Sequence, residues 1–216
     1  MTITQHLGDE SLAAFAAGSL DEGRRMVAAA HIDMCVRCRR WQSTLEHVGG
    51  ALLMDAAPES MSADALAKTL ARLDGAHLHA MDGAWPRIVP DEGPLPPAAL
   101  GHHATGRWSW IGRGIHHRPV ALSGGPGARV FLLKVDPGVR LPHHTHTGTE
   151  MTLVLSGAFE HAGGRFGPGD IEEADESVDH VPVVEAGEAC VCLVAMEGKL
   201  RLLGPMGRLL QPLVRF

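Results

Sequence analysis

Aromatic residues are scarce in this chain of 216 residues: it has no tyrosine, and aromatic side chains make up only 4% of it. Since 45% of the residues are hydrophobic, the core has to consist mainly of Leu, Val, Ala and Met. No apolar run approaches the roughly 18 residues of a membrane-spanning helix. The first residues, MTITQHLGDE, lack the basic and then apolar pattern of a signal peptide. We therefore expect a cytoplasmic protein without a membrane segment.

An excess of basic residues is missing as well, because the formal net charge is −6. Proteins that bind nucleic acid gather Lys and Arg on one face, so this charge argues against direct DNA binding. An acidic chain can instead pair with a basic protein partner. The sequence therefore favours a protein partner over a nucleic acid.

Cysteine is limited to four residues, which form the pairs Cys35/Cys38 and Cys190/Cys192, whereas histidine is abundant with 14 residues. In a reducing compartment a C-x2-C pair is more typical of a metal or redox motif than of a structural disulfide. The clustered His and Cys residues therefore indicate metal sites.

The first part of the chain has the periodicity of helices. Apolar residues recur at helical spacing in residues 9–18, 19–35, 39–54 and 62–73. Ser19 and Glu22 match a capping box at the start of the second helix, and Gly49 with Gly50 is expected to interrupt the third. This pattern predicts a small four-helix bundle over residues 1–83.

Five prolines fall in a short stretch after the helices, which predicts a linker over residues 84–98. Beyond it, short β-rich runs such as ARVFLLKV, EMTLVLSGAF and ACVCLVAM alternate with Gly and Pro turns. Regularly spaced strands without helices predict a sandwich or barrel over residues 99–216. The expected fold class is a multi-domain protein, α then β.

The helical half contains a pattern of metal ligands, HIDMCVRC. His31 and Cys35 lie four residues apart and share one helix face, and Cys38 follows closely enough to reach the same ion. This mixture of nitrogen and sulfur donors suits tetrahedral zinc. His6 is the best local candidate for the fourth ligand, with His47 or a water as alternatives. A redox dithiol, or two ordinary core cysteines, are the other interpretations of the pair.

This H-x3-C-x2-C pattern, with a histidine upstream, resembles that of the zinc-binding anti-sigma factors. The match comprises His6, His31, Cys35 and Cys38 in a helical domain whose last helix has a leucine stripe. The resemblance implies that residues 1–83 bind a sigma factor. The stripe of Leu66, Leu70 and Leu73 could either contact that partner or pack inside the bundle.

The strand-rich half resembles the cupins, whose first motif is G-x5-H-x-H-x3-E-x6-G. Alternation along a strand points His144 and His146 to the same face, and Glu150 follows in register. A degenerate second motif places His180 as fourth ligand. Three imidazoles with one carboxylate suit Zn, Fe, Mn or Ni. The residues that complete the first motif are Gly138 and Gly157.

Other polar residues of this half are expected to have no ligand role. Alternation turns His143 away from His144, so it is interpreted as a surface residue. His161 is expected to be solvated, as are the histidine pairs at 102–103 and 116–117. The acidic run 170–179 is interpreted as a charged loop, and Cys190 and Cys192 as small core residues on one face of a strand.

Together, the two halves and the linker resemble the ChrR-type anti-sigma factors along nearly the whole chain. The resemblance implies a regulator, not an enzyme, that binds and inhibits a group IV (ECF) sigma factor, with an expected 1:1 stoichiometry. It also implies that the cupin half senses oxidative stress such as singlet oxygen. Expected cofactors are Zn2+ in the helical half and Zn2+ or another divalent metal in the cupin half. The alternative is a metal-dependent cupin enzyme, of dioxygenase or isomerase type, with a helical accessory domain.

Overall fold

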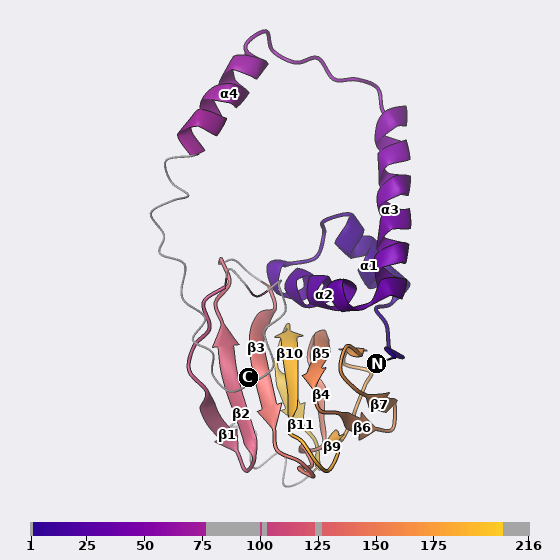
Figure 1. Cartoon of the computed structure of the whole chain (residues 1–216), viewed down its shortest axis with the longest axis vertical. Helices are drawn as coiled ribbons and strands as arrows, with labels where there is room; N and C mark the ends of the chain where they lie inside the picture. Colours follow the sequence, from indigo (N-terminus) through magenta and orange to yellow (C-terminus); the bar gives the residue numbers. More distant parts are fainter. Residues whose placement is uncertain (1, 77–99, 101–102, 124–126, 205–216) are drawn as a thin grey trace.

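A computed structural model describes residues 2–76, 100, 103–123 and 127–204 of the chain. Four helices come first, as the sequence predicts: α1 (Asp9–Ala16), α2 (Glu22–Met34), α3 (Val36–Asp55) and α4 (Ala65–Ala76) (Figure 1). In the described part of the chain, no helix has the length and apolar character needed to cross a membrane. The predicted linker, 84–98, lies outside the described residues.

Two details of the helical prediction are wrong. The capping residue of α2 is Asp21, whose carboxylate accepts hydrogen bonds from the backbone N–H groups of Gly23 and Arg24 at 3.0 and 3.1 Å. Ser19 instead donates its hydroxyl to the carbonyl of Ala14, and so belongs to the end of α1. The second error concerns the glycine pair 49–50, since α3 continues through it without a break.

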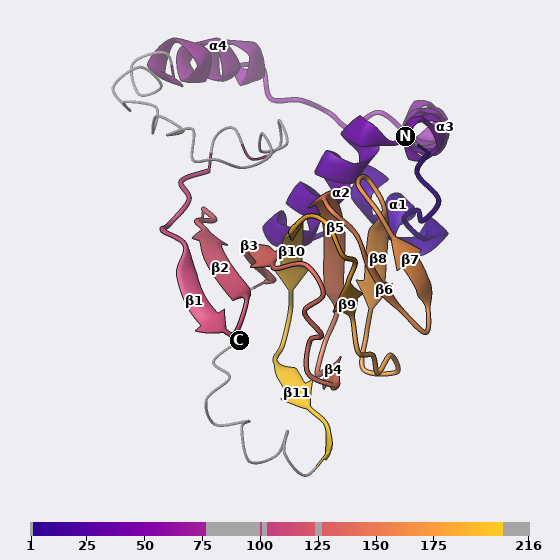
Figure 2. The ribbon, with the colours of Figure 1, turned by 60° about the horizontal axis from the view of Figure 1, so that its bottom comes forward.

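Of the four helices predicted to form a bundle, only three pack against one another. Helices α1, α2 and α3 pack together, whereas α4 lies apart from them in both views of the ribbon (Figures 1 and 2). Leu66, Leu70 and Leu73 on α4 are 71%, 51% and 57% exposed. The leucine stripe therefore does not contribute to a bundle core.

The second half is a β structure in which all the strand pairings of the described residues are antiparallel. The main sheet has the spatial order β1 (Ser109–Gly112), β2 (Ile115–Val120), β3 (Arg129–Val135), β10 (Cys190–Met196), β5 (Glu150–Ser156), β8 (Ile171–Ala174). Two smaller sheets close the barrel: β11 (Leu200–Leu202) pairs with β4 (His144–His146), and β6 (Phe159–His161) lies between β7 (Gly164–Phe166) and β9 (Val183–Val184).

Both faces of the main sheet are apolar, because each face packs into a different hydrophobic cluster. In β10, Leu193 and Ala195 belong to a core cluster that also contains helix residues such as Val27. Cys192 and Val194, which alternate with them, belong to a second cluster inside the barrel. Since successive side chains of a strand point to opposite faces, a continuous apolar run is what a strand covered on both sides requires.

Helix α2 provides the cover on the outer face. It lies across β5 and β10 (Figures 1 and 2), and its Gly23 approaches the barrel so closely that an added Cβ would come within 2.6 Å of the carbonyl oxygen of Ala128. The three packed helices and the barrel therefore share one hydrophobic core and are not two bodies joined only by a linker.

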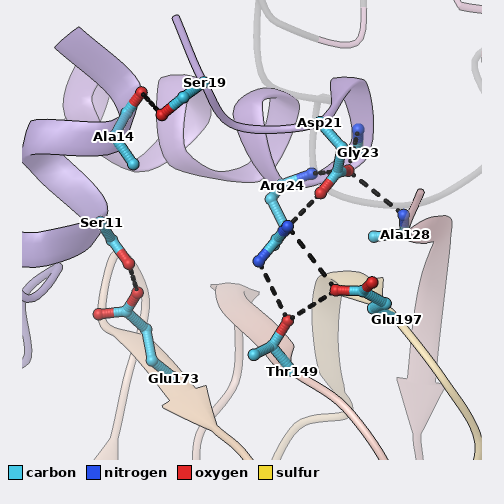
Figure 3. Close-up of polar contacts among 10 residues, drawn as sticks. All are labelled: Ser11, Ala14, Ser19, Asp21, Gly23, Arg24, Ala128, Thr149, Glu173 and Glu197. Atoms are coloured by element: carbon cyan, nitrogen blue, oxygen red, sulfur yellow. Dashed lines mark hydrogen bonds and ion pairs between the residues drawn. The ribbon is translucent and has the colours of Figure 1, made fainter. Parts of the chain in front are cut away.

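Polar contacts border this apolar junction (Figure 3). Arg24 on α2 pairs with Asp21, donates to the hydroxyl of Thr149 at 3.3 Å and lies 3.7 Å from the carboxylate of Glu197. The carboxylate of Glu22 accepts the backbone N–H of Ser123 at 2.9 and 3.0 Å. These contacts fix the rotation of α2 on the barrel.

The close approach at Gly23 leads to a stability prediction. A Gly23→Ala variant has to move α2 away from the backbone of Ala128, and such overpacking typically costs about 1–3 kcal/mol. The matched control is Gly49→Ala in the exposed part of α3, where an added Cβ meets nothing within 4 Å; alanine there should stabilise by about 0.5–1 kcal/mol. Denaturant unfolding of the full chain measures both, and a Gly23→Ala variant as stable as the parent would contradict the shared core.

Candidate metal centres

The first candidate centre lies where α2 meets α3. The ligand atoms of His6, His31, Cys35 and Cys38 all lie within 4.8 Å of one another. His31 is on the last turn of α2, Cys35 ends that helix and caps α3, and Cys38 is on the first turn of α3. His6 comes from the arm that precedes α1. The structure therefore brings together the four residues that the spacing singled out.

Local backbone geometry explains the C-x2-C spacing. Cys35 has extended backbone dihedral angles and its thiol accepts the N–H of Cys38 at 3.5 Å, as the N-cap of α3. Both sulfur atoms then face the gap between the helices, since Cys38 follows one helical turn later. Each imidazole contacts one thiol: His31 Nε2 lies 3.3 Å from Cys38 Sγ, and His6 Nδ1 lies 3.3 Å from Cys35 Sγ.

The alternative fourth ligand, His47, is not part of this group. It is exposed on α3, where its Nδ1 contacts the carbonyl of Ser43 at 2.5 Å. Four protein donors are therefore available at the first centre without His47. A centre with four protein ligands has no open position for a substrate, which is typical of structural zinc sites.

Burial controls the protonation of these ligands. Removal from water lowers the pKa of the His31 imidazole to about 4 and raises the pKa of the Cys38 thiol to about 11. The imidazole is thus neutral and ready to coordinate, whereas the thiol has to release its proton when a metal binds. A buried pair of thiols beside two neutral imidazoles fits a zinc ion well.

The second candidate centre lies inside the barrel. His144 and His146 alternate on β4, and both are buried, as is His180. The ligand atoms of these three histidines lie within 4.8 Å of one another. Glu150, at the start of β5, stands beside the group with its carboxylate 3.4 Å from His146 Nε2. The sequence motif thus leads to three converging imidazoles with a carboxylate next to them.

The hydrogen bonds of two imidazoles fix which nitrogen carries the proton. His144 Nδ1 lies 2.7 Å from the carbonyl oxygen of Pro142, and His180 Nδ1 lies 3.1 Å from the carboxylate of Glu172. Both oxygens only accept, so each Nδ1 donates. The two Nε2 atoms, which face each other at 3.0 Å, then both present lone pairs.

Two opposed lone pairs repel each other unless a cation lies close to both. Burial lowers the pKa of the His144 imidazole to about 4, so this ring carries no additional proton at neutral pH. The buried His146 Nδ1 has no hydrogen-bond partner, and Nε2 has only its long contact with the Glu150 carboxylate. These unsatisfied nitrogens, together with Glu150, fit a divalent metal ion.

Glu150 and His146 influence each other. Burial favours the neutral form of both, but the contact between them outweighs it and lowers the pKa of the Glu150 carboxyl while it raises the pKa of the His146 imidazole. The hydroxyl of Thr152 also donates to Glu150 at 3.1 Å. The carboxylate is therefore held ionised beside the three imidazoles.

Two residues of this centre were interpreted wrongly from the sequence. His161, expected to be solvated, has a side chain only 6% exposed, and its Nε2 lies 2.7 Å from the carboxylate of Glu172. Glu172, assigned to a charged loop, is a buried residue of β8. The run IEEA has two adjacent acidic residues and no apolar–polar alternation, so strand periodicity did not indicate that Glu172 faces the interior.

His161, Glu172 and His180 are close enough to resemble a further metal site. However, His161 Nδ1 accepts the backbone N–H of Gly163 at 3.0 Å, so the neutral ring carries its proton on Nε2 and has no lone pair to offer there. Glu172 instead accepts from His180 Nδ1, an arrangement that orients the imidazole and increases its basicity toward a metal. We therefore interpret these residues as a support for His180.

A cavity of about 180 Å³ adjoins the second centre. Apolar side chains such as Phe131 and Val194 form most of its wall, and His144, Glu150 and His180 form its polar end. Cys190 and Cys192 also line it as free thiols, with their sulfur atoms 3.6 Å apart, on the same face as predicted. The second centre therefore has space for a small molecule beside it.

The other histidine predictions can be placed only in part. His143 is exposed, as predicted, and lies 3.5 Å from the carboxylate of Asp179. His103, His116 and His117 are half-buried and not fully solvated, with the His117 ring 5.0 Å from that of Phe131. His102 lies outside the described residues.

Comparison with known proteins gives concordant results. Residues 97–199 match the family described as the ChrR cupin-like domain. The chain is similar to a chain in the crystal structure of Rhodobacter sphaeroides SigE in complex with the anti-sigma ChrR, with a TM-score of 0.73 and 36% identity, covering 91% of this chain and 100% of that one. The predicted order, four helices and then a cupin-like fold, is thereby confirmed.

Similarity also extends over the full sequence. The anti-sigma-E factor ChrR of Cereibacter sphaeroides is 38% identical over 220 residues, which cover 100% of this chain and 100% of that protein. Both halves, and with them both candidate centres, fall within the aligned region. With this identity along its whole length, the chain belongs to the family of ChrR anti-sigma factors.

Proposed function

We propose that this protein is an anti-sigma factor that binds and inhibits a group IV (ECF) sigma factor, with 1:1 stoichiometry, and releases it under oxidative stress such as singlet oxygen. The observation that carries the proposal is the full-length identity of 38% to the anti-sigma-E factor ChrR. It acts in the cytoplasm through its partner, without direct contact to DNA. The alternative of a metal-dependent cupin enzyme is not favoured, because that relative is a regulator.

The N-terminal centre is assigned to Zn2+, held by His6, His31, Cys35 and Cys38. Bound zinc supplies no reaction here; it joins the arm, α2 and α3 at one point. A structural zinc adds its binding free energy to folding when the site forms only in the folded chain. Its role is to keep the helices in the arrangement that the sigma factor recognises.

The cupin centre is assigned to Zn2+ or another divalent metal held by His144, His146, Glu150 and His180. When bound, the metal supplies a Lewis-acidic position at the end of the cavity. The apolar wall admits small uncharged molecules to this position. Imidazole and thiol groups that line the cavity are oxidisable, so this half of the protein is suited to sense an oxidant.

Exposed apolar side chains provide the surface for the partner. On α3, Leu52, Leu53 and Met54 are 69%, 75% and 87% exposed, and the leucine stripe of α4 is also exposed. A stripe such as that of α4 is typical of an amphipathic helix that lies in a groove of another protein. We therefore place the sigma-binding function in residues 1–83 and the sensor in residues 99–216, with 84–98 as the linker.

The first test uses the full chain as bait, because the helices share their core with the barrel. Tagged, zinc-loaded protein is incubated with lysate of the source organism, and the captured proteins are identified by mass spectrometry. The proposal requires a group IV sigma factor, which is then purified and shown to form a 1:1 complex by light scattering. Capture of no sigma factor would contradict the proposed function.

Charge placed on α4 should weaken the complex. We expect the double variant Leu66→Asp/Leu70→Asp to lose about 2 kcal/mol or more of binding free energy, roughly 30-fold in Kd, as for central apolar contacts of other interfaces. The matched control is Trp110→Asp, which alters an apolar side chain 69% exposed on the barrel strand β1. Calorimetry with the purified sigma factor measures both, and equal Kd values would exclude α4 from the interface.

Loss of a cupin ligand should separate sensing from binding. His144→Ala removes one imidazole from the second centre, so we expect metal affinity there to fall by at least the roughly 10- to 100-fold that outer-shell changes cause. The Kd for the sigma factor should stay unchanged, whereas its release by photogenerated singlet oxygen should be lost. Release is followed by fluorescence anisotropy of the labelled sigma factor.

The neighbouring His143 provides the control for this experiment. Its side chain is exposed and points to Asp179, so a His143→Ala variant should retain both the metal and the oxidant response. If His144→Ala and His143→Ala release the sigma factor at the same rate as the parent, the cupin metal is not the sensor.

A further inference from the structure

The arm that carries His6 is held by the barrel. Asp170 is only 3% exposed, and its Oδ1 accepts the backbone N–H groups of Thr4 and Gln5 at 2.6 and 2.9 Å. Its other oxygen accepts the N–H of Gly167 at 2.8 Å, which fixes the carboxylate in its own turn. The residues just before His6 are thus tied to one buried carboxylate.

A second acidic residue holds the arm on the other side of His6. The carboxylate of Glu173 on β8 accepts the N–H of Gly8 at 2.6 Å and the hydroxyl of Ser11 (Figure 3). His6 therefore lies between two anchors, and both come from residues 170–173 of the barrel. The arm contains no regular secondary structure of its own before α1, so these contacts determine where the imidazole lies.

The same part of the barrel orients the second histidine of the centre. The carbonyl oxygen of Gly169 lies 2.9 Å from His31 Nδ1. A carbonyl only accepts, so Nδ1 carries the proton and Nε2 presents its lone pair toward Cys38. Both imidazoles of the N-terminal centre are thus positioned from residues 169–173, whereas both thiols are positioned by the helices.

We propose that Asp170 is a positioning residue for the N-terminal metal centre: it holds the arm so that His6 completes the ligand set. The inference rests on the proposed metal binding at this centre. It adds that the helices carry three of the four ligands, and that the fourth, His6, depends on the hold of Asp170 on the arm. The barrel, through residues 169–173, is required for the closed coordination. Metal affinity of the helical half therefore depends on the integrity of this turn.

Cobalt is the probe for the test, because it replaces zinc in such sites and absorbs light. A charge-transfer band from thiolate to Co2+ arises only where cysteine binds the ion, and the part of this band that is lost when Cys35 and Cys38 are replaced reports the N-terminal centre. Metal-free full-length protein is titrated with Co2+, and the band is then followed during competition with a chelator. A Cys35→Ser/Cys38→Ser variant provides the blank.

In the Asp170→Ala variant, a water should replace His6 at the ion. We expect about 10- to 100-fold weaker Co2+ affinity, the usual effect of losing an outer-shell contact, together with a changed ligand-field spectrum. Asp170→Asn keeps an oxygen for Thr4 and Gln5 and should recover part of the affinity. The matched control is Asp175→Asn, whose carboxylate accepts the N–H of Ser177 at 2.8 Å in an exposed turn away from the arm; it should behave as the parent.

The possible results separate the two proposals. A parent protein without the thiolate band would remove the N-terminal metal centre itself and this inference with it. A parent with the band, and an Asp170→Ala variant with the same spectrum and the same chelator resistance, would overturn only the role of Asp170. If Asp170→Ala does not fold, as judged by thermal unfolding, the decision passes to Asp170→Asn, where an affinity equal to that of Asp175→Asn would overturn the proposal.

Discussion

The burial of α2 between the barrel and the other two packed helices is the constraint on which the remaining structure depends. Its close approach at Gly23 allows one face of the helix to cover the outer face of the main sheet. The last turn of the same helix carries His31, whose ring reaches back to the carbonyl of Gly169. This helix therefore belongs both to the shared core and to the first candidate metal centre.

The sequence was sufficient for the parts of the molecule that depend on local spacing. Four-residue spacing in a helix predicts that His31 and Cys35 share a face, and strand alternation predicts the same for His144 and His146. Both sets converge in the structure. His6 lies with the first set, because the arm before the first helix folds back on the helices.

Features that depend on tertiary packing could not be obtained in this way. Glu172 was assigned to a charged loop because its neighbours are acidic, and only the pairing of β8 with β5 shows that it faces the interior. His161 had no spacing partner in the sequence, since its contact with Glu172 joins two different sheets. Similarly, Ser19 and Asp21 both suit a helix N-cap, and the path of the chain after α1 decides between them.

The two candidate metal centres differ in character. The first offers four candidate protein ligands, and a closed set of this kind suits a site that holds helices in a fixed arrangement. The second lies at the end of a cavity, with His180 supported by Glu172. Strand β8 and the turn before it touch both: Glu172 faces the cupin centre, while Gly169, Asp170 and Glu173 hold the N-terminal one. The residues that contact the two candidate centres therefore belong to one continuous segment, residues 169–173.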